Sequence, residues 1–463
     1  MRTSIRTALA TAVTVSLTGG LLGLTTGTVT AAVPAKAPKP AQAYDFNGDG
    51  NRDYAASAGH WVDVTYGTRS GPGTRTFRFD QTSPGIPGDG PALEEDAFGR
   101  TMASADFNGD GYADLAVSDP EESIIDEADL DGVVIIVWGS KSGLGSKAST
   151  IESTAPYLRN QSFGVDLAAG DFNGDGRPDL AISDRTSVHV HRGGFTPANT
   201  TGRVESFTTP DDIALPFPML AAGNVTKDKT TDLYAIGESY MTNRPTMAVW
   251  FLKGGSTIKP AKPKLYPRSK TDYFTTDAVV ADFDKDGYGD LVYNDKLYKE
   301  LAGAVHVLRG GKNGPTTSRR ITQDTPGVAT TATAYDYFGG SLSTGDTNRD
   351  GYPDLAIGTH EPLGTLRRAG GAHVLYGGKK GLTGSGSEWF TRDTKGIPGK
   401  AKEGALFGGN TRLDDFDRDG DADLLLSGDS VKNGPGGTLL NGGRSGITTA
   451  KVREVPLRAT YEQ

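Results

Sequence analysis

One nine-residue segment recurs along this chain of 463 residues. Its first copy is Asp45-Phe46-Asn47-Gly48-Asp49-Gly50-Asn51-Arg52-Asp53, and further copies begin at Asp106, Asp171, Asp282, Asp346 and Asp415. A seventh, decayed copy begins at Asn224. The copies lie about 60 residues apart, and a period of this length predicts a repeat architecture in which each unit buries its apolar face against its neighbours.

Each repeat also contains short β-type runs around the segment. In the second repeat these runs are residues 98–106, 115–118, 132–139 and 149–153. Short runs separated by turns favour an antiparallel meander. The sequence therefore predicts an all-β fold, a seven-bladed β-propeller of four-stranded antiparallel blades. The first repeat lacks the run before its segment, so closure of the ring stays open, with residues 449–457 as a candidate for the last strand.

The composition of the segment points to a metal. Positions 1, 3, 5 and 9 are Asp or Asn in all six intact copies, and position 6 is Gly, which permits a tight turn. Ca²⁺ binds six to eight oxygen ligands from carboxylates, carbonyls and waters. The predicted calcium ligands, with position 7 contributing its backbone carbonyl, are Asp45, Asn47, Asp49, Asn51 and Asp53; Asp106, Asn108, Asp110, Tyr112 and Asp114; Asp171, Asn173, Asp175, Arg177 and Asp179; Asp282, Asp284, Asp286, Tyr288 and Asp290; Asp346, Asn348, Asp350, Tyr352 and Asp354; and Asp415, Asp417, Asp419, Asp421 and Asp423.

The copies differ in ligand charge. Those beginning at Asp282 and Asp415 have Asp at all four side-chain positions, so we expect them to bind calcium most tightly. In the decayed copy, Lys227 and Lys229 intrude and the glycine is missing, so we expect no metal there. Two alternatives remain, namely Asx turns without metal and a catalytic role for the carboxylates. If calcium occupies the intact copies, it neutralises most of the formal net charge of −9, so this acidity does not indicate a cationic partner.

Phe-Gly pairs lie eight residues before four of the segments, at Phe98, Phe163, Phe338 and Phe407. Each pair is followed by the Asp-rich segment, whose last Asp precedes a Leu, and later by a strand such as Gly303-Ala304-Val305. This order of motifs resembles the FG-GAP repeat of the integrin α-subunit propeller. The resemblance covers roughly residue 43 to the C-terminus. It implies a seven-bladed propeller with about six structural calcium sites in hairpin loops on one face.

The N-terminus has the pattern of a secretory signal peptide. Arg2 and Arg6 precede an uncharged stretch over residues 7–32 with small residues at its end. We therefore expect a signal peptide over residues 1–31, a Pro/Ala-rich linker over 32–42 and the propeller over 43–463, with a membrane anchor as the alternative. The chain has no cysteine, which excludes disulfides and thiol nucleophiles, and residues 455–463 form no apolar tail. A freely secreted protein without a membrane span after cleavage is expected.

Acidic residues should gather on the face opposite the predicted metal loops. They precede the second repeat or lie between its second and third strands, and they are Glu94, Glu95, Asp96, Asp119, Glu121, Glu122, Asp126, Glu127, Asp129 and Asp131. A solvated acidic loop, a further cation site and a docking surface for a basic partner are the three interpretations. The linker before the last repeat instead carries Lys395, Lys400 and Lys402.

The chain contains no nucleophile elbow, HExxH zinc motif, P-loop, or basic stripe with interleaved aromatics, so no nucleic-acid partner is expected. We expect a non-catalytic binding or adhesion scaffold for an extracellular protein or glycan. A secreted hydrolase or lyase with its site at the mouth of the channel is the alternative, and channel-facing acids on one or two blades would favour it. A carbohydrate-binding propeller would need regularly spaced exposed aromatics, whereas Tyr335, Tyr337 and Trp389 are scattered.

Overall fold

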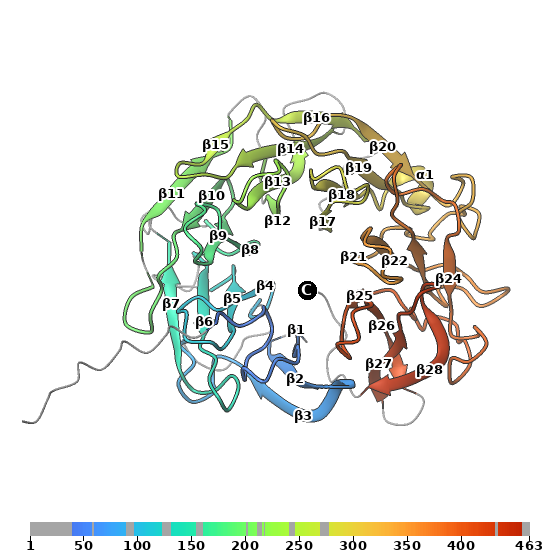
Figure 1. Ribbon diagram of the computed structural model, residues 1–463, viewed down its shortest axis with the longest axis horizontal. Coiled ribbons are helices and arrows are strands. Elements are labelled where there is room, and N and C mark those ends of the chain that lie inside the picture. Colours follow the sequence, from blue (N-terminus) through green and yellow to red (C-terminus); the bar gives the residue numbers. More distant parts are fainter. Residues whose placement is uncertain are drawn as a thin grey trace, which may run out of the picture. The chain divides into compact units, whose positions relative to one another are not determined.

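The computed structural model describes residues 39–57, 60–88, 97–122, 131–153, 161–200, 202–210, 215–216, 218–239, 246–268, 277–430 and 434–455. These residues belong to one compact unit that runs from residue 38 to residue 463. Their strands form seven antiparallel sheets arranged in a ring (Figure 1). The predicted seven-bladed β-propeller is therefore confirmed. The predicted signal peptide and most of the linker after it lie outside the described residues.

Each blade is built from one continuous stretch of chain. Blades 1 to 3 contain β1 (Tyr54–Ser57), β2 (Val62–Thr68) and β3 (Gly71–Phe79); β4 (Met102–Ala105), β5 (Asp114–Asp119), β6 (Val133–Val137) and β7 (Ala148–Glu152); and β8 (Leu167–Gly170), β9 (Asp179–Ser183), β10 (Ser187–His191) and β11 (Val204–Thr208). Blade 4 contains β12 (Met219–Gly223), β13 (Asp232–Ser239), β14 (Thr246–Lys253), β15 (Lys259–Pro260) and β16 (Lys264–Pro267).

Blades 5 to 7 repeat the same order. They contain β17 (Ala278–Ala281), β18 (Asp290–Asn294), β19 (Val305–Leu308) and β20 (Ser318–Ile321); β21 (Leu342–Gly345), β22 (Asp354–Thr359), β23 (Gly371–Leu375) and β24 (Glu388–Phe390); and β25 (Thr411–Asp414), β26 (Asp423–Ser430), β27 (Gly434–Asn441) and β28 (Thr448–Val455). The helical element α1 (Tyr298–Leu301), the only one in the described part of the chain, is a left-handed turn, since φ is 44° at Lys299 and 57° at Glu300.

Two blades depart from the four-stranded pattern in detail. In blade 1 three strands are present among the described residues, and the segment before its Asp-rich loop contacts blade 2 instead. There the backbone N–H of Ala41 donates to Asp106 Oδ2 (3.1 Å) and that of Tyr44 to Ser104 Oγ (2.8 Å). In blade 4 both β15 and β16 pair with β14.

The hydrophobic core is divided into seven clusters, one at each junction between neighbouring blades. Six of these clusters contain between 10 and 16 buried residues, whereas the cluster between blades 7 and 1 contains four. The alternation of apolar residues along the strands therefore serves packing between blades, and each blade depends on its neighbours for burial.

A glycine of one blade abuts the Phe-Gly pair of the next. Gly303, just before β19, has φ of 86°, and a Cβ there would lie 2.4 Å from the backbone N and O of Phe338. Gly132 stands in the same relation to Phe163, and Gly370 to Phe407. All three phenylalanine side chains are fully buried or nearly so. The two halves of the sequence motif thus form a close contact between adjacent blades.

Among the described residues, no strand is shared between blade 7 and blade 1, where the ring closes. β28 is the fourth strand of blade 7 and coincides with the candidate last strand to within two residues. The guanidinium of Arg412 lies 4.6 Å from the ring centre of Tyr44 and 5.6 Å from that of Tyr54. Arg52 forms an ion pair with Asp414. Cation–π and charge contacts therefore supplement the small apolar cluster at this junction.

The linkers after blades 1, 5 and 6 share a turn that our sequence analysis missed. The backbone N–H of Ser83 donates to Asp80 O, and that of Ile86 to Ser83 O. Equivalent pairs of bonds occur in residues 322–328 and 391–397. The signal was present as the similar segments Gln81-Thr82-Ser83-Pro84-Gly85-Ile86, Gln323-Asp324-Thr325-Pro326-Gly327-Val328 and Arg392-Asp393-Thr394-Lys395-Gly396-Ile397.

Within the described ranges, the structure contains no helix with the length and apolar character needed to cross a membrane.

Candidate metal sites

The nine-residue segment of each blade is here called its metal loop. It connects the first and second strands of blades 2 to 7 and precedes β1 in blade 1. Consecutive loops are joined by a backbone hydrogen bond, in which the N–H of position 8 donates to the carbonyl of position 1 in the previous loop. Four such bonds are Ala113 N to Asp45 O (2.9 Å), Thr231 N to Asp171 O (2.8 Å), Gly289 N to Asn224 O (2.9 Å) and Ala422 N to Asp346 O (2.8 Å). The metal loops therefore lie side by side on one face of the propeller.

Position 1 is fixed in the same way in every intact loop. The N–H of the position-6 glycine donates to Oδ2 of the position-1 aspartate, at 2.9 Å for Asp45 and 2.8 Å for Asp282. The same bond occurs at Asp106, Asp171, Asp346 and Asp415. The glycines have φ between 80° and 95°, which explains why glycine stands at this position. The bond orients Oδ1 of the aspartate inward.

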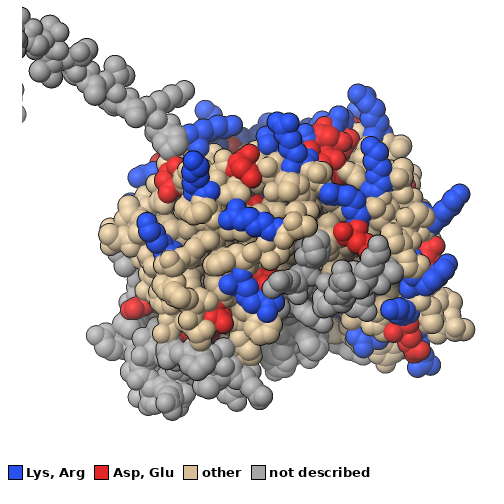
Figure 2. Space-filling model, turned by 90° about the horizontal axis from the view of Figure 1, so that it is seen from below, with Lys and Arg blue, Asp and Glu red and all other residues tan. Residues whose placement is uncertain are grey.

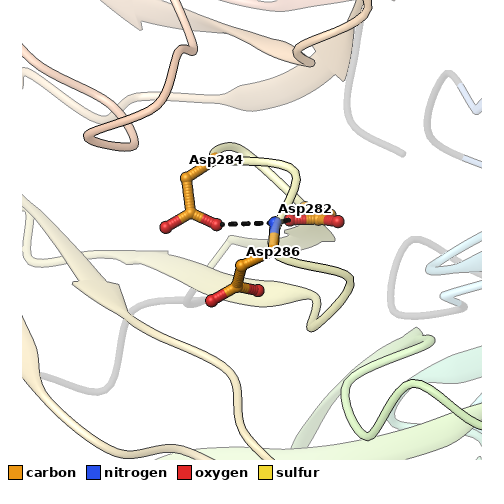
Figure 3. A group of neighbouring side chains, drawn as sticks. All are labelled: Asp282, Asp284 and Asp286. Carbon is orange, nitrogen blue, oxygen red and sulfur yellow. Dashed lines mark hydrogen bonds between the residues drawn. The ribbon is translucent and has the colours of Figure 1, made fainter.

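Positions 3 and 5 bring further oxygens to the same point. In blade 5 the N–H of Asp286 donates to Asp284 Oδ1 (3.2 Å) and to Asp282 Oδ1 (3.1 Å), which gathers the three carboxylates (Figure 3). One oxygen from each of these side chains lies within 4.8 Å of the others. Asp415, Asp417 and Asp419 form the equivalent group in blade 7. The two loops with the highest predicted ligand charge thus present convergent carboxylates.

Position 9 has a second task. The side chain of Asp53 is buried, and it accepts the N–H of Phe46 at Oδ2 (2.9 Å) and that of Gly67 at Oδ1 (2.7 Å). Asp114 repeats this arrangement with Phe107 and Gly139. This carboxylate ties the metal loop to the end of β2 in blade 1 and of β6, the third strand, in blade 2, a contact that the ligand pattern alone did not reveal. Since blade 1 has no described strand before its metal loop, β2 corresponds to the third strand of the other blades. Position 9 is also an aspartate that accepts such bonds in the other five blades, at Asp179, Asp232, Asp290, Asp354 and Asp423.

Burial makes these position-9 carboxyls harder to ionise. It raises the pKa of Asp114 to about 8 and that of Asp53 and Asp423 to about 7. Burial also raises the pKa of Asp290 and Asp354 to about 6. The neighbouring loop carboxylates add to the shift, since like charges disfavour ionisation. A divalent cation among these groups would oppose both effects.

Buried oxygens without a partner provide the test of whether a cation fits. Among the described residues, Asp45 Oδ1, Asp346 Oδ1 and Asp415 Oδ1 are shielded from solvent and accept no hydrogen bond. A buried carboxylate oxygen left unsatisfied is costly. All three are the position-1 oxygens that the glycine bond orients inward. Together with the all-oxygen donor set, this arrangement suits a calcium ion, for which oxygen ligands are required.

The decayed loop of blade 4 satisfies its polar groups internally. Thr226 Oγ1 donates to Asp232 Oδ2 (2.9 Å), and the amide of Asn224 donates to the carbonyl of Asp228 (2.9 Å). Lys253 Nζ, from the end of β14, lies 3.2 Å from Asp228 Oδ2. An ammonium group therefore contacts this loop where the other loops would hold a cation. That blade 4 carries no metal remains a prediction, and this contact supports it.

Lys227 itself points away from the loop that contains it. Its Nζ donates to the carbonyl of Asp286 in blade 5 (2.9 Å) and lies 5.4 Å from the ring centre of Tyr288. Lys285 extends in the same way from blade 5 to blade 6, where its Nζ lies 4.9 Å from the ring centre of Tyr352. The cation at position 4 thus contacts the metal loop of the following blade, which differs from the intrusion that we inferred from the sequence.

The inner strands enclose a central cavity of about 930 Å³. Asp277 of blade 5 is among the residues that line this cavity. Asp166 occupies the same repeat position in blade 3 and lies near the cavity. Asp166 accepts the N–H of Leu220 in blade 4 (2.6 Å), and Asp277 accepts that of Leu342 in blade 6 (2.7 Å). Burial raises the pKa of Asp166 to about 7, with a smaller contribution from Asp277. These acids therefore join neighbouring inner strands.

The described part of the acidic group on the opposite face is largely buried. Asp119 accepts the N–H of Ala97 (3.3 Å) and that of Glu121 (3.1 Å), and Glu122 accepts a bond from the Gln81 amide. Asp131 is also buried. These three residues differ from a solvated acidic loop because they are buried, and the carboxylates of Asp119 and Glu122 accept hydrogen bonds within the fold. The remaining members of the group, Glu94, Glu95, Asp96, Asp126, Glu127 and Asp129, lie outside the described residues.

The histidines and exposed aromatics form no repeated surface site in the described ranges. His189, His306 and His373 occur on the third strands, as expected, and each faces an acid: Asp184 at 2.8 Å, Asp295 at 3.7 Å and Glu361 at 2.6 Å. Tyr335 has 61% of its surface exposed, whereas Tyr337 packs on the ring of His360. On the side of the molecule shown in Figure 2, Lys and Arg are interspersed with Asp and Glu.

Comparison with known proteins agrees with this architecture. Residues 106–182 match the FG-GAP-like repeat family, and residues 338–375 match the FG-GAP repeat family. Integrin alpha-3 of Cricetulus griseus is 29% identical over 151 residues, which are 31% of this chain and 13% of the relative. Integrin alpha-PS2 of Drosophila melanogaster is 23% identical over 283 residues, 58% of this chain and 16% of the relative.

An enzyme is also among the similar proteins. Phosphatidylinositol-glycan-specific phospholipase D of Rattus norvegicus is 33% identical over 107 residues, which are 22% of this chain and 13% of the relative. In each of these three comparisons the match therefore covers at most 16% of the relative's own length.

Proposed function

We propose that this chain, an FG-GAP repeat protein with an integrin-like propeller, is a secreted binding scaffold that calcium stiffens and that recognises a protein or glycan partner. The observation that carries the proposal is the repeated geometry of the metal loops. In all six intact loops a glycine N–H orients the position-1 aspartate toward the other ligand side chains.

The loop residues would act as ligands as follows. Position 1 offers Oδ1, positions 3 and 5 offer side-chain oxygens, and position 7 offers its backbone carbonyl. The buried aspartate at position 9 closes the loop against the third strand while it contributes negative charge. Calcium would supply a divalent charge that neutralises these carboxylates and cross-links the hairpin. Because an unfolded chain cannot present this arrangement, binding would stabilise the fold by mass action.

We infer the partner surface by elimination. The metal loops are occupied by their own hydrogen-bond network, and the channel acids Asp166 and Asp277 connect inner strands. The linkers between blades and the loops between second and third strands leave the opposite face. Such loops on a rigid scaffold commonly carry binding. The similarity to integrin alpha chains supports a protein partner.

Chelation tests the metal part of the proposal. Thermal unfolding of residues 32–463 should show a large drop in midpoint with a chelator, reversed by calcium and not by magnesium. A single site at calcium one hundred times above Kd adds about 2.7 kcal/mol, so several sites give an effect that is easily measured. Metal analysis should find about six calcium ions per chain. A metal-free protein with an unchanged midpoint would overturn the proposal.

Secretion has its own test. The N-terminal pattern over residues 1–31 and the absence of cysteine are the observations that support an exported, calcium-stabilised chain. Protein recovered from the culture medium of an expressing bacterial host should begin near residue 32. Full-length protein retained in the membrane fraction would instead favour the anchor.

An enzyme is the second candidate, and two observations favour it. Asp277 of blade 5 lines the channel and Asp166 is buried near it at the same repeat position of blade 3, and one similar protein is named as a phospholipase D. The purified protein should be assayed for hydrolysis of a glycosylated phosphatidylinositol. Activity that disappears in Asp166→Asn, with the fold retained, would replace the scaffold by an enzyme.

A further inference from the structure

One residue follows the same course at the end of the corresponding strand in every blade, and in blades 3, 4, 5 and 7 its side chain contacts an aspartate of the metal loop. It is the residue just before the glycine whose N–H donates to the position-9 aspartate, and we call it the strand-end residue. Because that glycine is tied to the loop, the strand-end residue is positioned next to the ligand carboxylates. From blade 1 to blade 7 these residues are Tyr66, Trp138, Arg192, Lys253, Arg309, Tyr376 and Asn441.

In blade 5 the strand-end residue is paired with the ligand set. The Nη2 of Arg309 contacts Asp284 Oδ2 and lies 3.0 Å from Asp286 Oδ2. The side chain of Asp284 is 2% exposed, whereas that of Arg309 is 47% exposed. The guanidinium therefore approaches the loop from solvent and reaches two of the three carboxylates that converge in Figure 3.

Blade 7 provides the comparison within the same chain. Its strand-end residue, Asn441, donates its amide to Asp417 Oδ2 (2.7 Å) and brings no charge. A cation does reach this loop from blade 6, where Arg349 lies 3.1 Å from Asp419 Oδ1 and 2.7 Å from Asp421 Oδ1. However, this loop has one aspartate more than that of blade 5, at position 7. Blade 7 therefore keeps more uncompensated negative charge.

We propose that Arg309 is a built-in counter-cation that lowers the calcium affinity of blade 5. The inference rests on the proposed calcium binding and adds a residue that sets the affinity of one site. Arg cannot lose its charge in a protein, so calcium must displace the guanidinium from Asp284 and Asp286 in order to bind. Asp284, which stands at the position where the intact loops of blades 1, 2, 3 and 6 have Asn, then pairs with Arg309 in the absence of metal. Ligand charge alone predicts the same calcium affinity for blades 5 and 7, whereas the contacts of Arg309 predict a clearly higher affinity for blade 7.

The consequence is a graded response around the ring. As calcium falls, the site in blade 5 empties before that in blade 7, and Arg309 takes over the neutralisation of its carboxylates. The hairpin stays closed while the guanidinium moves between solvent and loop. Lys253 in blade 4, at the same strand position and 3.2 Å from Asp228, represents the limit in which a side-chain cation has replaced the metal.

The experiment measures the blade 5 site through its own tyrosine. Terbium, a luminescent substitute for calcium, is excited by nearby aromatic side chains, and Tyr288 occupies position 7 of this loop. In a Tyr112→Phe/Tyr352→Phe background the other two position-7 tyrosines are silent, and the part of the emission that Tyr288→Phe then removes belongs to blade 5. All three substitutions keep the backbone carbonyl. Displacement of terbium by calcium then reports calcium affinity. The variants are Arg309→Gln, the matched control Arg320→Gln on β20 of the same blade, Asp284→Asn, and the double variant Arg309→Gln/Asp284→Asn.

Arg309→Gln should tighten calcium binding about threefold to fivefold, in line with the worth of a half-exposed ion pair. Arg320→Gln should leave the affinity within about twofold of the starting value. In the Asp284→Asn background, removal of Arg309 should change the affinity by much less, because its main partner is gone. Unchanged or weaker binding in Arg309→Gln, with Asp284→Asn still weakening the site, would overturn the counter-cation. Absence of terbium binding from every variant would instead overturn the calcium proposal itself.

Discussion

The contact between Gly303 and Phe338 leads to a quantitative prediction about how neighbouring blades are locked together. Substitution Gly303→Ala has two separate costs. The first is conformational, because an L-residue at a φ of 86° costs about 1–2 kcal/mol. The second is steric, because the new methyl group would lie 2.4 Å from the backbone N and O of Phe338. Backbone atoms cannot rotate away, and overpacking of this kind costs about 1–3 kcal/mol. We therefore expect a loss of about 2–5 kcal/mol in the free energy of unfolding.

Gly364→Ala separates the two costs. Gly364 also has a positive φ, of 61°, but a Cβ there meets no atom within 4 Å. Any gain from restricting the unfolded chain is common to both variants and cancels in their difference. Gly303→Ala should therefore be about 1–3 kcal/mol less stable than Gly364→Ala. Urea unfolding at saturating calcium, followed by tryptophan fluorescence, measures this difference. A difference below about 0.5 kcal/mol would refute the tight backbone contact, because it would lie within the usual error of such comparisons.

Three further predictions follow from the same structure. Burial places the pKa of Asp166 near 7, above that of an unfolded aspartate, so wild-type stability should decline as pH rises from about 4 to about 7. In urea unfolding at several pH values, Asp166→Asn should lack this part of the decline, and parallel curves for the two proteins would contradict the assignment. Arg412→Gln should cost about 1–2 kcal/mol and speed proteolysis in blades 1 and 7 first, because it removes the cation over Tyr54 at the closure of the ring; cleavage that starts elsewhere would argue against this role. Asn441→Arg should bring a guanidinium to Asp417, and the rise in melting temperature on adding calcium should become smaller than in wild type.

The fold was predictable because its cause is repeated in the sequence. A period of about 60 residues, together with a turn-forming segment at a constant place in each unit, leaves few architectures other than radial blades. Ring closure was harder to predict, since it depends on a single junction that no repeat describes. The contact of Arg412 with Tyr44 and Tyr54 joins residues more than 350 positions apart, and no local pattern marks it.

The metal loops were predictable as a ligand list but not as a set of unequal sites. The spacing of acidic residues indicated which side chains would converge, and those of blades 5 and 7 do. It could not show that the position-9 carboxylate is tied to Gly67 and its equivalents, or that Arg309 reaches Asp284. Both contacts depend on how the end of the third strand meets the loop. Aligning the seven repeats by that glycine would have identified the strand-end residue as a variable position, although not its contacts.

The seam between blades 7 and 1 has a consequence for how the molecule is made and how it yields to force. No described strand passes from one side of the seam to the other, and only four buried apolar residues cluster there. As the chain is synthesised from its N-terminus, its blades thus first form an open arc. The ring is completed when blade 7 docks against blade 1. Tension applied across the seam would open it before any β-ladder tears.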